Sequence, residues 1–328
     1  PFLRGREFLW QEGHTIHATE EEAREETLRM LEIYADICEN WLAMPVIRGD
    51  KTEKEKFAGA ENTYTIECMM HDHKALQSGT SHYFGDGFAK AFNITFSDKE
   101  NKLRNPHETS WGMSTRVIGG LIMTHGDNNG LVLPPKIAPI QVVVLPIAAH
   151  KPGVTEAAEA VVERLKAAGV RVKGDFSDNS PGWKFAEWEM KGVPLRLELG
   201  PRDIEAGVCV AARRDSGEKV TVPLAELETA VPQLLEAVQQ GLFDKAKRNL
   251  DEHTYTAQTV DEVKDVIENR GGGFIKTMWC GDEACELKMK ELAGVSSRCM
   301  PFEQEHLGGV CPVCGRPARK MIIWGVAY

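Results

Sequence analysis

The 328-residue sequence lacks three features that would each assign it to a broad class of protein. It has no uninterrupted apolar run near the ~20 residues of a membrane helix, so we expect no membrane-spanning segment. It has no excess of positive charge, because 49 acidic and 39 basic side chains give a formal net charge of −10. That balance argues against loose binding of polyanions but leaves room for a local basic groove that engages RNA. It also has neither a secretory signal nor an initiating methionine, and we interpret Pro1 as the start of an N-terminally incomplete chain.

Cysteines are few and unevenly spaced. Of eight, four form two close pairs near the C-terminus, Cys280-x4-Cys285 and Cys311-x2-Cys314. Without a secretory signal, this pattern favours a reducing compartment and metal binding over disulfides. Four thiolates in two pairs match a closed, tetrahedral structural zinc site. The alternative is a redox pair, which would need an exposed thiolate of low pKa, a property that spacing does not reveal.

The first segment combines one long helix with several strands. Thr19 and Glu22 have the spacing of a capping box, and apolar residues then recur at helical spacing as far as Trp41. A strand entering a helix is predicted over residues 107–124. Other strands are predicted at residues 63–70, 75–82 and 93–96.

Three domains follow from these patterns, at residues 1–138, 139–250 and 251–328. A proline-rich stretch closes the first. The second opens on the Val-rich run 140–147, which suits a strand buried on both faces, and continues as alternating helices and strands of an α/β domain. The third is a small segment that contains both cysteine pairs.

A bound phosphate would explain the positions of two arginines in the sequence. Arg4 precedes a strand-like stretch that carries Trp10, Glu12 and His14, so a phosphate could be held at one end and a small polar ligand at the other. A buried strand whose charges pair locally explains these residues equally well. Arg116 opens a predicted helix, where a cation is unfavourable unless it reaches an anion bound at the helix N-terminus. The alternative for Arg116 is a surface arginine paired with an acid.

Two further residues admit two interpretations each. Phe57 lies in a charged loop and is either a loop anchor or a lid over a pocket. His82 ends a predicted strand together with hydroxyl side chains. A structural histidine with satisfied hydrogen bonds is the default for it, and contact with a ligand is the alternative.

Several segments in collinear order resemble those of prolyl-tRNA synthetases of the archaeal and eukaryotic-like type, which also occurs in some bacteria. The resemblance continues through the cysteine pairs to Tyr328 and so covers essentially the whole chain. The segments that carry it are residues 1–17, 54–59, 75–82, 109–116, 124–135 and 182–194.

The resemblance implies a multidomain α+β and α/β architecture: part of a class II antiparallel-sheet catalytic domain, an α/β anticodon-binding domain and a small C-terminal zinc-binding α+β domain. It implies an ATP-dependent ligase of the cytoplasm that, with ATP and Mg²⁺, joins L-proline to tRNA(Pro) through prolyl-adenylate. The complete protein would form a homodimer. Such catalysis depends on positioning and on neutralising phosphate charge.

The resemblance also assigns roles to individual residues. Arg4 and Arg116 would be the catalytic pair that holds the ATP phosphates. Phe185, to which the resemblance assigns a role in anticodon binding, could instead belong to the helix core. The implied nucleotide-binding residues are Arg4, Gly5, Gln77, Thr80, Ser114 and Arg116. The implied proline-binding residues are Trp10, Glu12, His14, Phe57, His82 and Ser110. The implied anticodon-binding residues are Phe185, Glu189, Arg196 and Lys219, and the implied zinc ligands are Cys280, Cys285, Cys311 and Cys314.

The sequence departs from the family pattern at its beginning. Motif 1, the loop that recognises the proline amine and the first arginine of motif 2 would all lie upstream of Pro1. A non-catalytic tRNA-binding fragment or regulatory paralogue is therefore the alternative function. Between His17 and Ser110 there is no room for an additional domain of ~100 residues, so we expect no editing domain within the chain.

Overall fold

The structure is a computed structural model that describes residues 3–328, and it divides into two compact units. Unit 1 contains the chain up to Asn40 together with Met44–Thr124 and Lys247–Tyr328, and unit 2 contains Trp41–Ala43 and His125–Ala246. Pro1 and Phe2, which open the first segment of the resemblance, lie outside the described residues.

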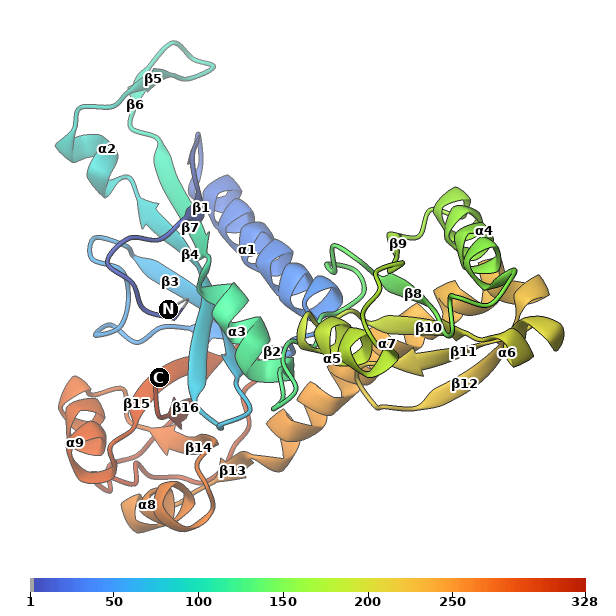
Figure 1. The fold of residues 1–328 in the computed structure, drawn as a ribbon. Helices are drawn as coiled ribbons and strands as arrows, with labels where there is room; N and C mark the ends of the chain where they lie inside the picture. The colour runs from blue at the N-terminus through green and yellow to red at the C-terminus, as the bar shows by residue number, and fades with distance from the viewer. Residues whose placement is uncertain (1–2) are drawn as a thin grey trace. The chain divides into compact units, whose positions relative to one another are not determined.

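Unit 1 contains helices and strands from both ends of the chain (Figure 1). Its helices are α1 (Glu20–Asp36), α2 (Gly87–Ala91), α3 (Arg116–His125, whose last residue belongs to unit 2), α8 (Val260–Asn269) and α9 (Glu283–Ala293), and a π-helical turn, Ile37–Trp41, follows α1. Its strands are β1 (Trp10–His17), β2 (Val46–Asp50), β3 (Asn62–Met69), β4 (Ala75–Gly85), β5 (Phe96–Ser97), β6 (Leu103–Arg104), β7 (His107–Ser114), β13 (Thr254–Thr256), β14 (Phe274–Trp279), β15 (Ser296–Pro301) and β16 (Lys320–Gly325).

Nine of these strands form one sheet in the order β1-β7-β4-β3-β2-β15-β16-β14-β13. Every neighbouring pair is antiparallel except β13 and β14. The antiparallel sheet predicted for the first segment is therefore confirmed. The strand predicted at residues 93–96 is wrong in extent, because only β5 forms there, and β5 pairs with β6 in a separate two-stranded ribbon.

The helix α1 packs on one face of the strands β1, β7, β4 and β3 and not on the other. It begins at the predicted cap, where the Thr19 side chain accepts a hydrogen bond from the Glu22 amide. Ser81 of β4 donates to the carbonyl of Thr27 in α1. Because side chains alternate along a strand, the neighbours Thr80 and His82 point to the opposite face. The functional side chains of β4 therefore lie away from α1.

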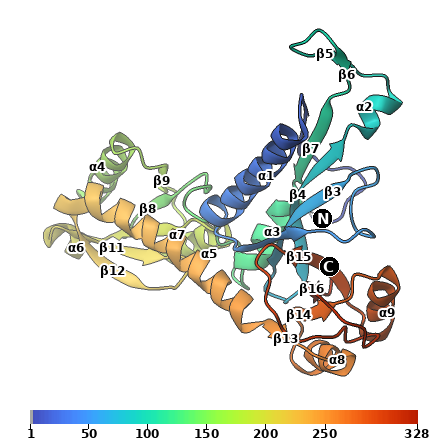
Figure 2. The same ribbon diagram turned by 180° about the vertical axis from the view of Figure 1, so that it is seen from behind.

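The C-terminal segment continues the same sheet. Met300 and Pro301 of β15 pair with Asp50 and Gly49 of β2, and the remaining C-terminal strands follow outward (Figure 2). A core that includes Met289, Ile322 and Trp324 lies between these strands and the helices α8 and α9. The division of the chain at residue 251 stays a prediction, but the compact unit that contains this segment also contains the first one.

Unit 2 is an α/β domain around a five-stranded sheet, as predicted, in the order β12-β11-β10-β8-β9. The Val-rich strand β8 is buried on both faces, with Val142 and Val144 on the side of α4 and α7 and Val143 and Leu145 on the side of Trp188. Its strands are β8 (Val142–Pro146), β9 (Val172–Gly174), β10 (Leu195–Leu199), β11 (Val208–Arg213) and β12 (Lys219–Pro223). Its helices are α4 (Val154–Ala167), α5 (Pro181–Met190), α6 (Pro201–Glu205), a 3-10 turn at Leu224–Glu226 and α7 (Leu227–Glu252), whose last residues belong to unit 1. No helix in residues 3–328 has both the length and the apolar character to span a bilayer.

Candidate active site

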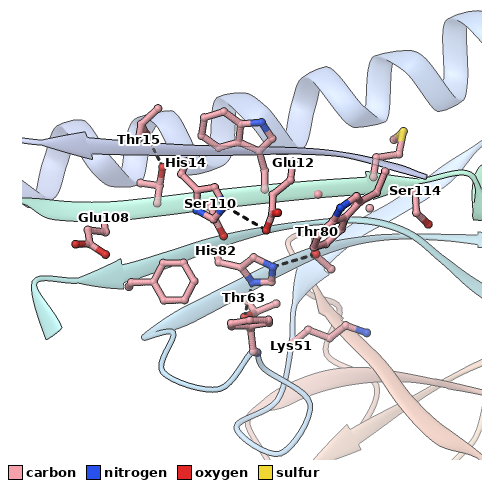
Figure 3. Close-up of a pocket in the computed structure, with 18 of the residues that line it drawn as sticks. Glu12, His14, Thr15, Lys51, Thr63, Thr80, His82, Glu108, Ser110 and Ser114 are labelled. Carbon is pink, nitrogen blue, oxygen red and sulfur yellow. Dashed lines mark hydrogen bonds and ion pairs between the residues drawn. The ribbon is translucent and has the colours of Figure 1, made fainter. Parts of the chain in front are cut away.

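A cavity of about 740 Å³ opens on the uncovered face of the unit 1 sheet (Figure 3). Its floor is formed by β1, β7 and β4, and the loop 51–61 forms one wall. Every proline-binding residue implied by the resemblance lines this cavity, and so do Gln77, Thr80, Ser114 and Arg116. Residues that are far apart in the sequence are therefore gathered around one space.

Strand register explains how these side chains meet. His14 of β1 pairs with Ser110 of β7, and Ser110 pairs with His82 of β4. In the next row of the same face, Glu12 pairs with Gly112, and Gly112 pairs with Thr80. Since paired residues on antiparallel strands have neighbouring side chains, the first row presents three polar side chains to the cavity, and the second presents Glu12 and Thr80 on either side of Gly112.

The middle of β1 is built around a close approach between Gly13 and Trp111. A Cβ atom on Gly13 would lie 2.3 Å from the indole of Trp111, so glycine is needed for the ring to pack there. The flanking Glu12 and His14 point into the cavity, and their side chains form an ion-pair contact of 3.2 Å. This packing sets the position of both side chains along the cavity floor.

His82 has the satisfied hydrogen bonds of a structural histidine, and its contact with a ligand stays a prediction. Its Nδ1 lies 3.0 Å from the Thr63 hydroxyl and its Nε2 lies 3.1 Å from the Thr80 hydroxyl. Both ring nitrogens are thus satisfied, yet the ring also lines the cavity. Burial lowers the pKa of His82 to about 4, so the imidazole is neutral at physiological pH. A neutral, flat ring of this kind suits contact with an uncharged apolar group.

Phe57 lies over this part of the cavity. Its ring centroid is 5.0 Å from that of His82 and 5.8 Å from that of Phe84, although 55% of the residue is exposed. A buried loop anchor would be largely covered, so its exposure favours the lid interpretation. The loop 51–61 that carries it forms the wall of the cavity.

The pKa of His82 predicts a loss of stability on mild acidification. The folded state holds the neutral ring down to a pKa of about 4, whereas the unfolded chain protonates near 6.5. A lowered pKa means that stability is fully present above pH 6.5 and falls as the pH drops toward 4. We expect His82 to contribute a loss of about 2 kcal/mol between pH 7 and pH 5. Buried His125 in unit 2 has the same shift and should contribute separately.

Urea unfolding of the wild type and a His82→Gln variant at these two pH values measures that contribution. The variant should lose less stability between pH 7 and pH 5 than the wild type. An identical loss in both proteins would contradict the assignment to His82.

The two predicted phosphate-binding arginines converge on Tyr328. The Arg4 Nη2 donates to the main-chain oxygen of Tyr328 at 2.8 Å, and its guanidinium lies 4.8 Å from the centroid of the tyrosine ring. The guanidinium of Arg116 lies 5.5 Å from the same centroid, and its Nε donates to the carbonyl of Leu3 at 3.3 Å. Tyr328, to which sequence assigned no role, thus stands between them.

Arg4 and Gly5 lie in a second hollow of about 730 Å³, which shares Phe8, Ser114 and Arg116 with the first cavity. Within residues 3–328, Arg116 forms no ion pair with an acid, so the alternative of an acid-paired surface arginine is wrong. The Ser114 hydroxyl accepts a hydrogen bond from the Arg116 amide at 3.3 Å. Two arginines that pair with no Asp or Glu side chain within residues 3–328, and that lie in adjoining hollows, provide a site for an anion.

The predicted anticodon residues also lie together, in unit 2. Arg196, Lys219 and Glu189 line a hollow of about 230 Å³. The guanidinium of Arg196 lies 4.1 Å from the ring centroid of Phe185, so this ring is at least partly a platform for polar groups. Glu198, which sequence did not single out, accepts hydrogen bonds from Arg196 at 3.0 Å and from Lys219 at 3.2 Å.

Trp188 is core rather than surface. It is 5% exposed, and its Nε1 donates to the Asp175 carboxylate at 2.8 Å. An indole that is buried and hydrogen-bonded in this way is not free to stack on a base.

Four cysteines gather in the C-terminal segment. The Sγ atoms of Cys280, Cys285, Cys311 and Cys314 all lie within 4.8 Å of one another, and those of Cys280 and Cys314 are 3.8 Å apart. A tetrahedral zinc ion with Zn–S bonds of about 2.3 Å requires sulfur atoms about 3.8 Å apart. The donor set therefore fits a tetrahedral metal site.

Arg316 borders this cysteine cluster. Its Nε donates to the Cys314 sulfur at 3.3 Å, and this contact lowers the pKa of that thiol to about 6. An exposed thiolate alone would also satisfy the redox alternative, but a redox pair would not bring four sulfur atoms together. Cys299 is buried and lies outside the cluster.

Comparisons with known proteins agree with this geometry. Residues 1–125 match the tRNA synthetase class II core domain (G, H, P, S and T), residues 141–234 match an anticodon binding domain, and residues 260–328 match the C-terminal domain of prolyl-tRNA synthetase. The whole chain is 61% identical to the proline–tRNA ligase of Lachnospira eligens and 58% identical to proline–tRNA ligase 2 of Bacillus cereus, and covers 68% of each.

This chain belongs to the prolyl-tRNA synthetase family. The crystal structure of the Cryptosporidium parvum prolyl-tRNA synthetase, complexed with L-proline and AMP, superimposes on the whole chain with a TM-score of 0.95 at 43% identity, and 71% of that chain is covered. The fold expected from the resemblance to prolyl-tRNA synthetases is thereby confirmed.

Proposed function

We propose that this chain catalyses the ATP-dependent attachment of L-proline to tRNA(Pro). The observation that carries the proposal is that Arg4 and Arg116 converge on Tyr328 and that Arg116 also lines the cavity that presents Trp10, His14 and His82. The family to which the chain belongs supports the same reaction. The alternative, a fragment that binds tRNA without catalysis, leaves this convergence of arginines and pocket unexplained.

The reaction has two steps. The proline carboxylate attacks the α-phosphate of ATP, which yields prolyl-adenylate and releases pyrophosphate. A terminal ribose hydroxyl of tRNA(Pro) then attacks the carbonyl, which yields prolyl-tRNA and releases AMP. Arg4 and Arg116 would neutralise phosphate charge as it shifts between these groups, and arginine suits this role because its planar fork binds two oxygens at once.

The remaining residues would position the substrates. Gln77 and Thr80, with Gly5 and Ser114, would contact the nucleotide. Trp10, His82 and Phe57 would enclose the apolar ring of proline, while Glu12, His14 and Ser110 would satisfy its polar groups. Mg²⁺ would accompany ATP, where it supplies additional positive charge to the phosphates.

We propose that the four-cysteine cluster holds a structural Zn²⁺. All four positions of a tetrahedral ion would be taken by Cys280, Cys285, Cys311 and Cys314, which leaves no open position for catalysis. We also propose that the protein acts in the cytoplasm and as a homodimer, as the resemblance implies.

A charging assay with purified tRNA(Pro) and labelled proline tests the function and the anticodon surface together. The full-length protein should form prolyl-tRNA(Pro). Arg196→Ala should raise the KM for tRNA at least about tenfold, because Arg196 and Phe185 would stack on and read an unpaired base. ATP–pyrophosphate exchange, which does not need tRNA, should be unchanged.

The exposed Arg164, which pairs with Glu228 on another surface of unit 2, provides a matched control. Arg164→Ala should charge tRNA(Pro) normally. If both variants lost charging equally, the hollow around Arg196 would not be the anticodon site. If the wild type charged no tRNA with proline, the proposed function would fail.

A further inference from the structure

Behind the cavity lies a cluster of three buried charges that sequence did not identify. Glu67 of β3 is at its centre, with a side chain that is 1% exposed. The Lys51 ammonium lies 2.8 Å from one carboxylate oxygen, and Arg298 donates from Nε at 3.0 Å and from Nη2 at 2.7 Å to the other. The side chains of Lys51 and Arg298 are only 4% and 9% exposed. Charges buried this deeply are costly unless their partners are fixed, so the cluster has one preferred arrangement.

The cluster joins the C-terminal segment to the cavity wall. Arg298 belongs to β15, Lys51 follows β2, and β2 pairs with both β15 and β3. Lys51 also donates to the main-chain carbonyl of Arg298 at 2.8 Å. Figure 3 shows Lys51 at the edge of the cavity, beside the faint red ribbon of the C-terminal segment.

Glu67 stands directly opposite Gln77, at an irregular point of the sheet. The register between β3 and β4 shifts here, so that Ile66 pairs with Gly79 and Glu67 with Gln77, and Ser78 is left as the extra residue of a bulge. A bulge redirects the side chains next to it. Gln77 lines the cavity as a result, in the part assigned to the nucleotide. The charge cluster therefore fixes the strand position from which Gln77 projects.

We propose that Arg298 is a positioning residue for nucleotide binding. By holding Glu67 with a two-point contact, it fixes the bulge and so the place of Gln77 in the cavity. This inference rests on the proposed function, because it assumes that Gln77 contacts ATP.

The proline end should be less sensitive to Arg298 than the nucleotide end. The row His14–Ser110–His82 is linked to the cluster indirectly, through Thr63, which bonds to His82 by its hydroxyl and to the Lys51 amide by its carbonyl. The loop that carries Phe57 also has a second anchor beyond Lys51, because Thr52 donates to the buried Glu286 of α9 at 3.1 Å and Ser297 donates to the same carboxylate. Loss of the Arg298 side chain should therefore change the KM for ATP more than the KM for proline.

Arg298→Met is the informative variant, because it leaves the Lys51–Glu67 pair neutral and intact. Glu67→Gln would instead leave two buried cations without their anion and would be expected to unfold the sheet. In ATP–pyrophosphate exchange by the full-length protein, Arg298→Met should raise the KM for ATP about tenfold and change the KM for proline less than about twofold. The kcat should fall less than about threefold, which is the pattern of lost binding rather than lost chemistry. Arg298→Lys should give an intermediate KM for ATP, because it restores the charge but not the fork.

Thr277→Val is the matched control. Thr277 is fully buried in the same sheet and accepts a hydrogen bond from the Trp324 indole at 2.9 Å, away from the cavity. It should lower the melting temperature without changing either KM. If Arg298→Met left the KM for ATP unchanged, or raised both KM values equally, the inference would be overturned. Absence of proline-dependent exchange in the wild type would instead overturn the proposed function.

Discussion

Replacing Arg116 with alanine is expected to lower proline-dependent ATP–pyrophosphate exchange at least about 10³-fold in a protein that remains folded. The guanidinium of Arg116, at the start of α3, converges with Arg4 on Tyr328 and forms no acidic ion pair within residues 3–328, so its removal takes away a positive charge that remains available to an anionic ligand. Losses of this size are typical when a single preorganised group that stabilises phosphoryl charge is removed. Exchange rates at saturating ATP and proline, together with circular dichroism, measure the effect.

Arg29 offers a matched control in the same unit. It lies exposed on α1 and pairs with Glu25 and Glu26, each at 2.6 Å. Surface pairs of this kind contribute little, so Arg29→Ala should keep the wild-type exchange rate within about twofold. Arg116→Lys should recover only part of the activity, because a point charge cannot bind two oxygens at once. An Arg116→Ala protein with more than a tenth of the wild-type rate would remove Arg116 from the reaction.

Replacing Cys311 with serine is expected to abolish zinc binding and to lower the melting temperature by at least about 10 °C. Cys311 is 1% exposed and packs in the C-terminal core as well as facing the other three sulfur atoms. Structural zinc contributes directly to folding free energy, and each thiolate ligand is needed for the closed tetrahedron. The expected shift corresponds to a loss of several kcal/mol of stability. Metal analysis of the purified protein, with differential scanning calorimetry, measures both effects.

Replacing Cys299 provides a control that distinguishes the loss of a zinc ligand from the loss of a buried thiol. It is 1% exposed, as Cys311 is, and lies in the same segment but outside the cluster. Cys299→Ala should therefore retain about one zinc per chain. Equal zinc content in the Cys311→Ser protein and the wild type would show that the cluster is not a zinc site.

Much of the candidate site could be predicted because its signals are local. The pairs Cys280-x4-Cys285 and Cys311-x2-Cys314 place two thiols each within a turn, so spacing alone indicates a common metal. Thr19 marks the start of α1 for the same reason, since a cap acts over three residues. The side chains that share a row on β1, β7 and β4 could be predicted only with the help of the resemblance, because the register between strands cannot be read from the sequence of a single strand.

The charge cluster of Lys51, Glu67 and Arg298 could not be predicted in this way. Each of these residues reads as an ordinary surface charge, and Arg298 lies 231 residues from Glu67. Only the pairing of β15 with β2 brings them together, and such long-range pairing leaves no local pattern. The continuation of the unit 1 sheet into the C-terminal segment was missed for the same reason, as was the position of Tyr328 between Arg4 and Arg116.

The measurement that tests the central claim most directly is ATP–pyrophosphate exchange by the full-length protein with each amino acid supplied singly. If Arg4 and Arg116 hold one nucleotide beside a pocket for proline, L-proline should support exchange far better than any larger or charged amino acid, and Arg4→Ala should abolish it. Exchange that proceeds equally without proline, or that survives the loss of either arginine, would contradict the account.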